Sequence, residues 1–328
     1  RIVRNLLKES GFADADEAED GMVAINKLRA THAGLRVVFL VDSLPQLALI
    51  EHWFTCRADA QPFEVLLEIG FTGGRTGCRS EADALALARR LHASTAVQFV
   101  GIECYEGLWA KGDSTADQEW VTILMDRVDA VALQCVEEGL FDGDEVIVSA
   151  GGSAIFDLVA ARLNPSLGRP VLPLLRSGCY VTHDHGTYTR MLQAMAPRLG
   201  CDCGDALRPA LEVWALVQSR PEPGLAIVGA GKRDLSFDMG LPTPIARAAP
   251  GVLLSQLVPT GWRIDGLNDQ HAYLRWDATD AALDALAPVV GERIGLGISH
   301  PCTTFDKWRW MPVVEADYRV SDAISIDF

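Results

Sequence analysis

The stretch Phe-Glu-Val-Leu-Leu-Glu-Ile-Gly (residues 63–70) decides the fold class, because it is a mostly apolar run of strand length that ends at a glycine. Such runs are typical of strands that are covered on both faces of a parallel sheet. An Ala- and Leu-rich helical segment follows at 81–94. The same alternation continues from residue 37 to residue 186, with further strands expected at 37–42, 97–104, 145–150 and 170–176. Five such units, with a sixth candidate at 13–19, amount to most of a (β/α)8 barrel.

Beyond residue 205 the pattern changes to segments that alternate or run apolar between Gly and Pro breaks, at 208–219, 224–230 and 271–276. This pattern is typical of a mainly β domain. We therefore expect an α/β fold, in which a (β/α)8-type barrel that could be incomplete at its N-terminus is followed by a mainly β C-terminal domain. The expected domains are an N-terminal segment at 1–30, the barrel portion at 31–204 and the mainly β domain at 205–328.

The N-terminal segment 1–30 has a different character from the rest. Helices are expected at 1–11, which stops at Gly11, and at 21–30. Residues 1–28 resemble the first helix, second strand and second helix of a chemotaxis response-regulator receiver domain. The acidic pocket that would hold magnesium in a receiver is not encoded. Because this segment differs in character from the rest, three interpretations stay open: the chain could be a chimera, a fragment or a natural protein.

Composition narrows the class of protein. The 328 residues carry a net charge of −15, which argues against a nucleic-acid partner, because phosphate backbones are bound by clustered Lys and Arg. The eight cysteines are scattered and are expected to be reduced thiols in a cytoplasmic protein. No apolar run reaches the roughly 18 residues that a membrane helix needs. We expect no nucleic-acid and no membrane partner.

An imidazole and a thiol stand two residues apart at His300 and Cys302. In an extended segment such residues point to the same face, so both could reach one ion, and Pro301 limits how far the backbone between them can flex. Imidazole plus thiolate suits zinc better than magnesium or calcium. The alternative is a hydrogen-bonded surface histidine beside a cysteine that acts as a small buried hydrophobe.

A family resemblance favours the metal. Ser-His-Pro-Cys-Thr-Thr-Phe-Asp-Lys-Trp (residues 299–308), preceded by Leu-Asn-Asp-Gln-His-Ala (267–272), resembles the C-terminal signature of the D-serine dehydratase and D-threonine aldolase family. The resemblance covers about 36–328 and implies an alanine-racemase-type barrel, a pyridoxal 5'-phosphate (PLP) cofactor and a divalent metal. It places the metal, most plausibly zinc, on His300 and Cys302, and gives His271 a weaker catalytic role.

Polar residues and glycines gather where the expected strands end, which is where such barrels carry their chemistry. The resemblance implies that Arg75 faces the pyridine nitrogen of PLP, although a structural ion pair is an alternative, and that Tyr105 lines the pocket. A glycine-rich strand-to-helix turn presents free N–H groups that suit a phosphate. The resemblance makes two such turns the phosphate cup, with Tyr180 beside the ring as a catalytic candidate; the cup residues are Gly151, Gly152, Ser153, Gly178 and Cys179. We expect His183 and His185 to lie behind this site or at the surface.

The lysine that PLP chemistry requires is not identified. PLP forms a Schiff base with a lysine before its substrate displaces that lysine. The sequence holds five lysines, and none lies in a family-like lysine motif. These are Lys8, Lys27, Lys111, Lys232 and Lys307. The resemblance therefore implies a family member whose catalysis is impaired.

The expected function is that of a PLP- and zinc-dependent lyase of the D-serine or D-3-hydroxyaspartate dehydratase type. It would act on D-amino acids with a β-hydroxyl, and the family implies a homodimer. Cys302 favours the dehydratase, because a harder carboxylate ligand would favour manganese. The alternatives are a D-threonine aldolase-type C–C lyase, a catalytically dead PLP or metal binder, and a fold chimera without activity.

Overall fold

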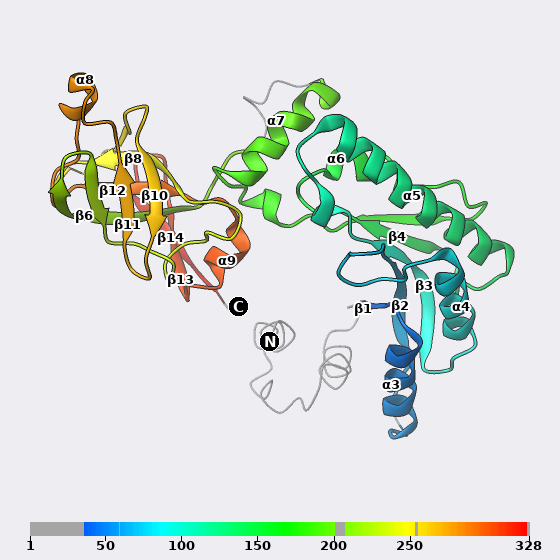
Figure 1. Ribbon diagram of the computed structural model, residues 1–328. Helices are drawn as coiled ribbons and strands as arrows, with labels where there is room; N and C mark the ends of the chain where they lie inside the picture. The colour runs from blue at the N-terminus through cyan, green and yellow to red at the C-terminus, as the bar shows by residue number, and fades with distance from the viewer. Residues whose placement is uncertain (1–35, 59, 201–206, 253–254, 327–328) are drawn as a thin grey trace. The chain divides into compact units, whose positions relative to one another are not determined.

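The computed structural model describes residues 36–58, 60–200, 207–252 and 255–326 (Figure 1). The chain divides into two compact units, one ending at Gly178 and the other beginning at Cys179. The helices expected at 1–11 and 21–30, the strand candidate at 13–19 and the receiver-like segment lie outside the described residues. The expected domain boundary at 204/205 lies inside the second unit, between a helix that ends at Leu199 and a strand that begins at Glu212. It stays a prediction.

The first unit is built on a five-stranded parallel sheet of order β1-β2-β3-β4-β5. Each predicted strand is confirmed to within one residue at either end. Their bounds are β1 (Val38–Val41), β2 (Phe63–Ile69), β3 (Val97–Cys104), β4 (Val146–Ala150) and β5 (Val171–Leu175). Because sequential parallel strands lie side by side, their carboxyl ends meet along one edge of the sheet.

Helices follow these strands, as the sequence predicted. They are α3 (Leu44–Thr55), α4 (Glu81–His92), α5 (Ser114–Glu137) and α6 (Phe156–Ala160), with the short 3-10 helix η2 (Gly107–Trp109). The side chains of Ser80 and Asp113 cap α4 and α5 by accepting bonds from the free N–H groups of the first turn. These caps explain why the two helices begin where they do.

Alternate strand residues pack on opposite faces of the sheet. Val65, Leu67 and Ile69 of β2 belong to the large core that includes helix residues such as Leu87 and Met125. The intervening Leu66 joins a small separate cluster with Val100 and Ile147. The mostly apolar character of 63–70 thus arises because both faces of β2 bury side chains.

The second unit is mainly β, as predicted. It opens with the 3-10 helix η3 (Cys179–Val181) and α7 (Thr187–Leu199), and continues into a seven-stranded antiparallel sheet of order β10-β11-β7-β6-β12-β8-β9. The strands are β6 (Glu212–Glu222), β7 (Leu225–Val228), β8 (Thr243–Ala248), β9 (Gln256–Leu257), β10 (Arg263–Leu267), β11 (Ala272–Arg275) and β12 (Arg293–Gly297). Two short helices, α8 (Ala281–Asp284) and α9 (Pro301–Phe305), and a hairpin of β13 (Trp310–Val314) and β14 (Val320–Ser325) complete it.

Within the described ranges, no helix combines the length and the apolar character that crossing a membrane requires.

Candidate metal centre

His300 and Cys302, the candidate metal ligands, lie where β12 ends and α9 begins. His300 is the residue before the helix, in an extended conformation, and Pro301 occupies the first helical position. Proline favours that position, because its fixed φ suits a helix and its missing N–H is not needed there. Cys302 therefore lies on the first turn of a helix. The expectation that both residues share one extended segment was wrong for Cys302, but the turn still brings the two side chains together.

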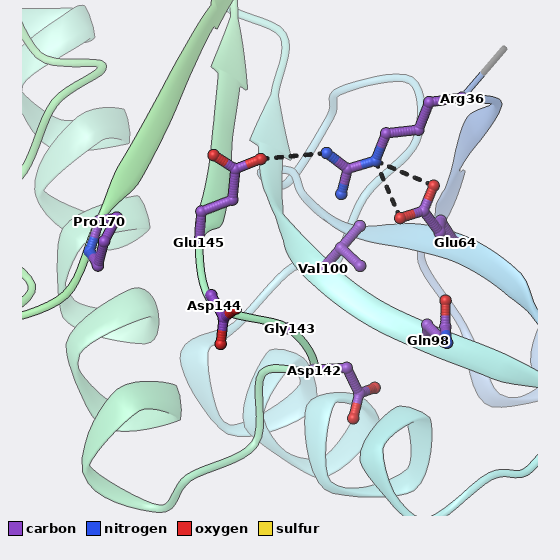
Figure 2. A pocket seen from close by; sticks show the side chains of 9 residues that line it. All are labelled: Arg36, Glu64, Gln98, Val100, Asp142, Gly143, Asp144, Glu145 and Pro170. Carbon is purple, nitrogen blue, oxygen red and sulfur yellow. Dashed lines mark hydrogen bonds and ion pairs between the residues drawn. The ribbon is translucent and has the colours of Figure 1, made fainter. Parts of the chain in front are cut away.

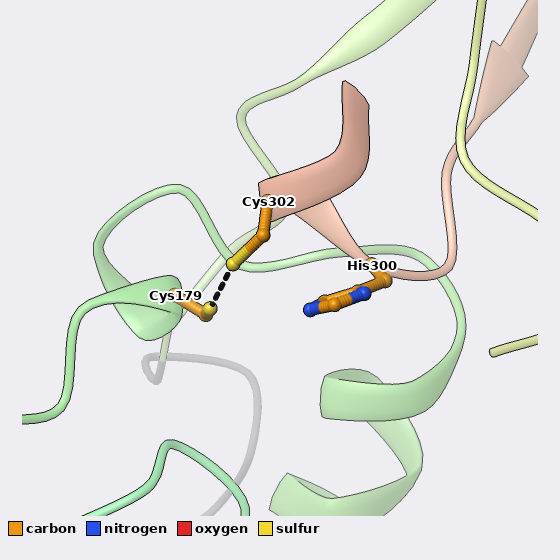
Figure 3. A group of neighbouring side chains, drawn as sticks. All are labelled: Cys179, His300 and Cys302. Atoms are coloured by element: carbon orange, nitrogen blue, oxygen red, sulfur yellow. Dashed lines mark hydrogen bonds between the residues drawn. The ribbon is translucent and has the colours of Figure 1, made fainter. Parts of the chain in front are cut away.

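A third candidate ligand joins the pair. One ligand atom from each of Cys179, His300 and Cys302 lies within 4.8 Å of the other two. Figure 3 shows the three side chains pointing toward one another. The sulfurs of Cys179 and Cys302 are 3.0 Å apart. Cys179 comes from η3, far away in the sequence. The sequence had assigned Cys179 only to a phosphate cup, so its place beside His300 and Cys302 is new information from the fold.

Asp238 holds the imidazole of His300 in one orientation. The Nδ1 atom of His300 lies 2.6 Å from Asp238 Oδ2, and the Thr303 hydroxyl donates to Asp238 Oδ1 at 2.9 Å. With Nδ1–H bound to the carboxylate, Nε2 is the nitrogen left to bind an ion. A carboxylate behind a histidine is the usual outer partner of a metal ligand. Sequence reasoning missed Asp238, since it lies in a different loop from His300.

The three ligand groups shift one another's pKa values. The interaction with Cys179, reinforced by Asp238, raises the pKa of His300 from 6.5 to about 9, although burial opposes the shift. Hydrogen bonding to Cys302, helped by His300 and Tyr188, lowers the pKa of the Cys179 thiol to about 4. The same contact with Cys179 raises the pKa of Cys302. The cluster thus favours one thiolate, on Cys179, which is hydrogen-bonded to the Cys302 thiol and to the His300 imidazolium.

The turn His-Asp-His-Gly (residues 183–186) connects the two parts of this cluster. The N–H of His183 donates to the Cys179 carbonyl at 2.8 Å, and the N–H of His185 donates to the Ile298 carbonyl at 2.9 Å. Asp184 Oδ1 accepts from the N–H groups of Gly186 and Tyr188, both at 2.9 Å, at the start of α7. His183 is buried, so it is not a surface residue, and neither histidine belongs to the ligand cluster.

Glycine is required where the two segments touch. A Cβ atom on Gly186 would lie 2.2 Å from Ser299 Oγ and 3.0 Å from the Ser299 Cα. Ser299 directly precedes His300, so any added bulk at Gly186 must displace the chain that carries a ligand. By contrast, a Cβ on Gly178, the residue before Cys179, would meet no atom within 4 Å.

The first unit holds Arg75, Tyr105 and the glycine turn at 151–153 at the carboxyl edge of its sheet. The guanidinium of Arg75 lies 5.0 Å from the ring centre of Tyr105, which fits a cation–π contact. The N–H groups of Gly151 and Gly152 both donate to the carboxylate of Glu106, at 3.1 and 2.5 Å. Glu106 is fully buried, and burial raises its pKa. The N–H groups of the glycine turn thus bind the carboxyl group of Glu106, which sequence reasoning did not single out.

The roles of these residues toward PLP stay predictions. A phosphate at this turn would need donors other than the two glycine N–H groups that Glu106 occupies. Ser153 is buried nearby in the chain, and Ser177 donates to the carbonyls of Gly151 and Gly152 at 3.3 and 3.1 Å. The side chain of Tyr180 is not among those that the structure describes.

His271 lies in the second unit, where its Nε2 is 3.0 Å from Gln218 Oε1. It lines a shallow cavity of about 380 Å³ together with Lys232 and Asn268. His271 does not belong to the ligand cluster. Its catalytic role stays a prediction.

PLP also needs a lysine. The described lysines are Lys111, Lys232 and Lys307, and none of these three lies in a strand of either sheet. The amino group of Lys232 and that of Lys307 both lie near the ring of Phe237. The described residues therefore do not complete a PLP site, whereas the donor set of the metal centre suits an ion.

A larger cavity, of about 570 Å³, lies at the opposite edge of the parallel sheet, by the starts of its strands (Figure 2). Arg36 crosses it, donating from Nε to Glu64 at 2.9 Å and from a terminal nitrogen to Glu145 at 3.2 Å. These bonds link the starts of β2 and β4. In (β/α)8 barrels this edge serves stability, so we assign Arg36 a structural role.

Known proteins resemble this chain in sequence and in fold. The family described as "Putative serine dehydratase domain" matches residues 210–314, which include His300 and Cys302. A D-threonine aldolase from Arthrobacter sp is 26% identical over 274 residues, which are 83% of this chain and 62% of that protein. The chain thus spans about six tenths of the length of this curated relative.

Solved structures show the same fold. The crystal structure of D-threonine aldolase from Filomicrobium marinum matches with a TM-score of 0.71 at 21% identity, covering 99% of this chain and 79% of the other. A D-threo-3-hydroxyaspartate dehydratase in which a cysteine is replaced by alanine, in its metal-free form, matches with a TM-score of 0.63 at 24% identity, covering 90% and 74%. The prediction of a barrel-type unit followed by a mainly β domain is confirmed.

Replacing Gly186 with alanine should disrupt the metal centre. The new methyl group would collide with Ser299 and shift His300 away from the two sulfurs. We expect Gly186→Ala to lower the melting temperature and weaken zinc binding, measured by calorimetry on the metal-stripped chain. Gly178→Ala is the matched control and should change neither quantity. Equal behaviour of the two variants would contradict the close packing described here.

Zinc affinity should increase with pH. Because the pKa of His300 is raised to about 9, its imidazole is protonated at neutral pH in the metal-free protein, and an ion must displace that proton. The apparent dissociation constant should therefore fall by about tenfold or more per pH unit between pH 6.5 and 9. Asp238→Asn, which removes one cause of the raised pKa, should move this dependence to lower pH. A dissociation constant that does not vary over this range would refute the assignment.

Proposed function

We propose that Cys179, His300 and Cys302 hold one divalent metal ion, and that this ion is zinc. The observation that carries the proposal is the convergence of their ligand atoms within 4.8 Å. Two thiolates and an imidazole suit zinc, and three protein ligands leave the fourth tetrahedral position open. An open position is what separates a catalytic zinc site from a structural one. The metal-free dehydratase with a replaced cysteine supports a metal in proteins of this fold.

We further propose that the centre serves a lyase that acts on D-amino acids with a β-hydroxyl group. The match to the serine dehydratase domain family and the D-threonine aldolase relative support this class of reaction. Zinc bound there would polarise the hydroxyl oxygen of the substrate and help it leave as water. Thiolate ligands favour zinc, and with it the dehydratase over the aldolase alternative.

The chain's own residues prepare the centre in three ways. Asp238 holds the Nδ1 proton of His300, so that the Nε2 lone pair faces the ion. Hydrogen bonding to Cys302, helped by His300 and Tyr188, lowers the pKa of Cys179 and so favours its thiolate form, which is the form that binds a metal. The turn at 183–186 joins the Cys179 segment to the chain that leads into His300, which fixes the spacing of the ligands.

The metal proposal is tested with cobalt(II), a spectroscopic substitute for zinc. Titration of the metal-stripped chain should give a sulfur-to-cobalt charge-transfer band of two-thiolate intensity. Cys179→Ser and Cys302→Ser should each remove about half of it, and Asp238→Asn should weaken binding by about 10–100-fold. Cys56→Ser, which removes an exposed cysteine elsewhere, is the control. A wild-type chain without the band would refute the metal centre, and an unchanged band in Cys179→Ser would remove Cys179 from it.

A second candidate is a metal binder without turnover. It is favoured by the finding that none of the described lysines lies in a strand. Borohydride reduction in the presence of PLP, followed by peptide mapping, separates the candidates. A reduced adduct on one lysine, together with ammonia release from D-serine or D-3-hydroxyaspartate, would support the lyase. Cobalt binding without an adduct would support the binder.

The remaining expectations belong to the same proposal: a small D-amino acid as the substrate, a homodimer as the assembly and the cytoplasm as the location.

A further inference from the structure

The sulfurs of Cys179 and Cys302 lie in direct contact, at 3.0 Å. A disulfide bond is about 2.05 Å long, so closing the bond requires a movement of about 1 Å. The two cysteines lie on separate segments, so a bond between them would be a long-range cross-link.

The backbone holds the two cysteines in this arrangement. The hydrogen bond from His183 N–H fixes the Cys179 carbonyl, and the bond from His185 N–H fixes Ile298, which leads into the turn that carries Cys302. A preformed pair loses little conformational freedom when it is joined, which favours the disulfide over two open thiols.

The other described cysteines behave differently. Cys78, Cys104 and Cys135 are buried, and Cys104 contacts the sulfur of Met125. Cys56 is exposed, and its neighbour at 4.0 Å is a histidine. Cys302 is exposed and Cys179 half-buried, so a small oxidant can reach the pair. Among the cysteines that the structure describes, Cys179 and Cys302 therefore combine access to solvent with a sulfur partner in contact.

We propose that Cys179 and Cys302 form a reversible disulfide when the metal-free chain meets a small disulfide of the glutathione type. One cysteine thiolate attacks a sulfur of oxidised glutathione, forms a mixed disulfide and releases one glutathione. The second cysteine then attacks the protein sulfur of that mixed disulfide and releases the second glutathione. The two cysteines are oxidised by two electrons, and the oxidised glutathione is reduced to two thiols.

The disulfide and the metal exclude each other. A sulfur in a disulfide is no longer a thiolate ligand, so oxidation would leave His300 as the sole member of the three-residue cluster able to bind zinc. Conversely, bound zinc occupies both sulfurs and protects them from oxidation. This part rests on the proposed metal centre, whereas formation of the disulfide does not. The site would thereby respond to the thiol–disulfide balance of its surroundings.

The test treats the full, metal-stripped chain with oxidised glutathione, blocks free thiols and maps the peptides by mass spectrometry. We expect a peptide pair cross-linked through Cys179 and Cys302 that dithiothreitol separates. Cys56→Ser should form it equally well. Cys179→Ser and Cys302→Ser should instead keep a glutathione on the remaining cysteine. Glutathione adducts in the wild type without this cross-link, or a cross-link of either residue to another cysteine, would overturn the proposal.

A second arm repeats the oxidation after loading with zinc. At a zinc concentration about 100 times the dissociation constant, cross-linking should slow by about 100-fold, because so little metal-free chain remains. Cross-linking of a chain that neither binds zinc nor is protected by it would refute the metal centre and support the disulfide. Zinc binding without any cross-link in the metal-free chain would overturn the disulfide and leave the metal centre standing.

Discussion

Two backbone hydrogen bonds from one turn join the chain segments that carry the proposed metal ligands. His183 donates to the carbonyl of Cys179, and His185 donates to the carbonyl of Ile298, two residues before His300. Each such bond contributes only about 1 kcal/mol net, but leaving a buried partner unpaired costs more. Gly186 makes the contact possible, since any larger residue would collide with Ser299. The proposed metal ligands are thus positioned by turn residues that do not belong to the ligand cluster themselves.

Electrostatics then prepares the cluster for an ion. Cys179, His300 and Cys302 lie in contact, so each group shifts the pKa of the others. The pKa of Cys179 is lowered, and the pKa values of His300 and Cys302 are raised. A divalent ion would replace the protons of this cluster and neutralise its sulfurs. A disulfide would remove the same anionic charge by a covalent bond.

The features that depend on a local sequence pattern were predicted from the sequence. Strands such as β2 were predicted because burial on both faces demands a mostly apolar run. His300 and Cys302 were predicted as a pair from their spacing of two residues together with the family resemblance of residues 299–308. Cys179 and Asp238 were missed as members of the centre, because only the folded chain brings them to His300. No local pattern marks such a long-range contact.

The glycine turn at 151–152 shows a different limit. Its N–H groups were expected to bind a phosphate, and in the structure they donate to the buried carboxyl group of Glu106. A sequence can indicate that a turn suits negative charge without indicating which group supplies it. The same limit applies to Arg75, whose contact with Tyr105 is now visible while its role toward PLP stays a prediction.

The measurement that tests the central claim most directly is X-ray absorption of the zinc-loaded chain, with Cys179→Ser as the comparison. A centre made by Cys179, His300 and Cys302 predicts two sulfur ligands at about 2.3 Å and lighter ligands, including one imidazole nitrogen, at about 2.0–2.1 Å. The variant should lose one of the two sulfurs. A wild-type spectrum with a single sulfur, unchanged in the variant, would contradict the account.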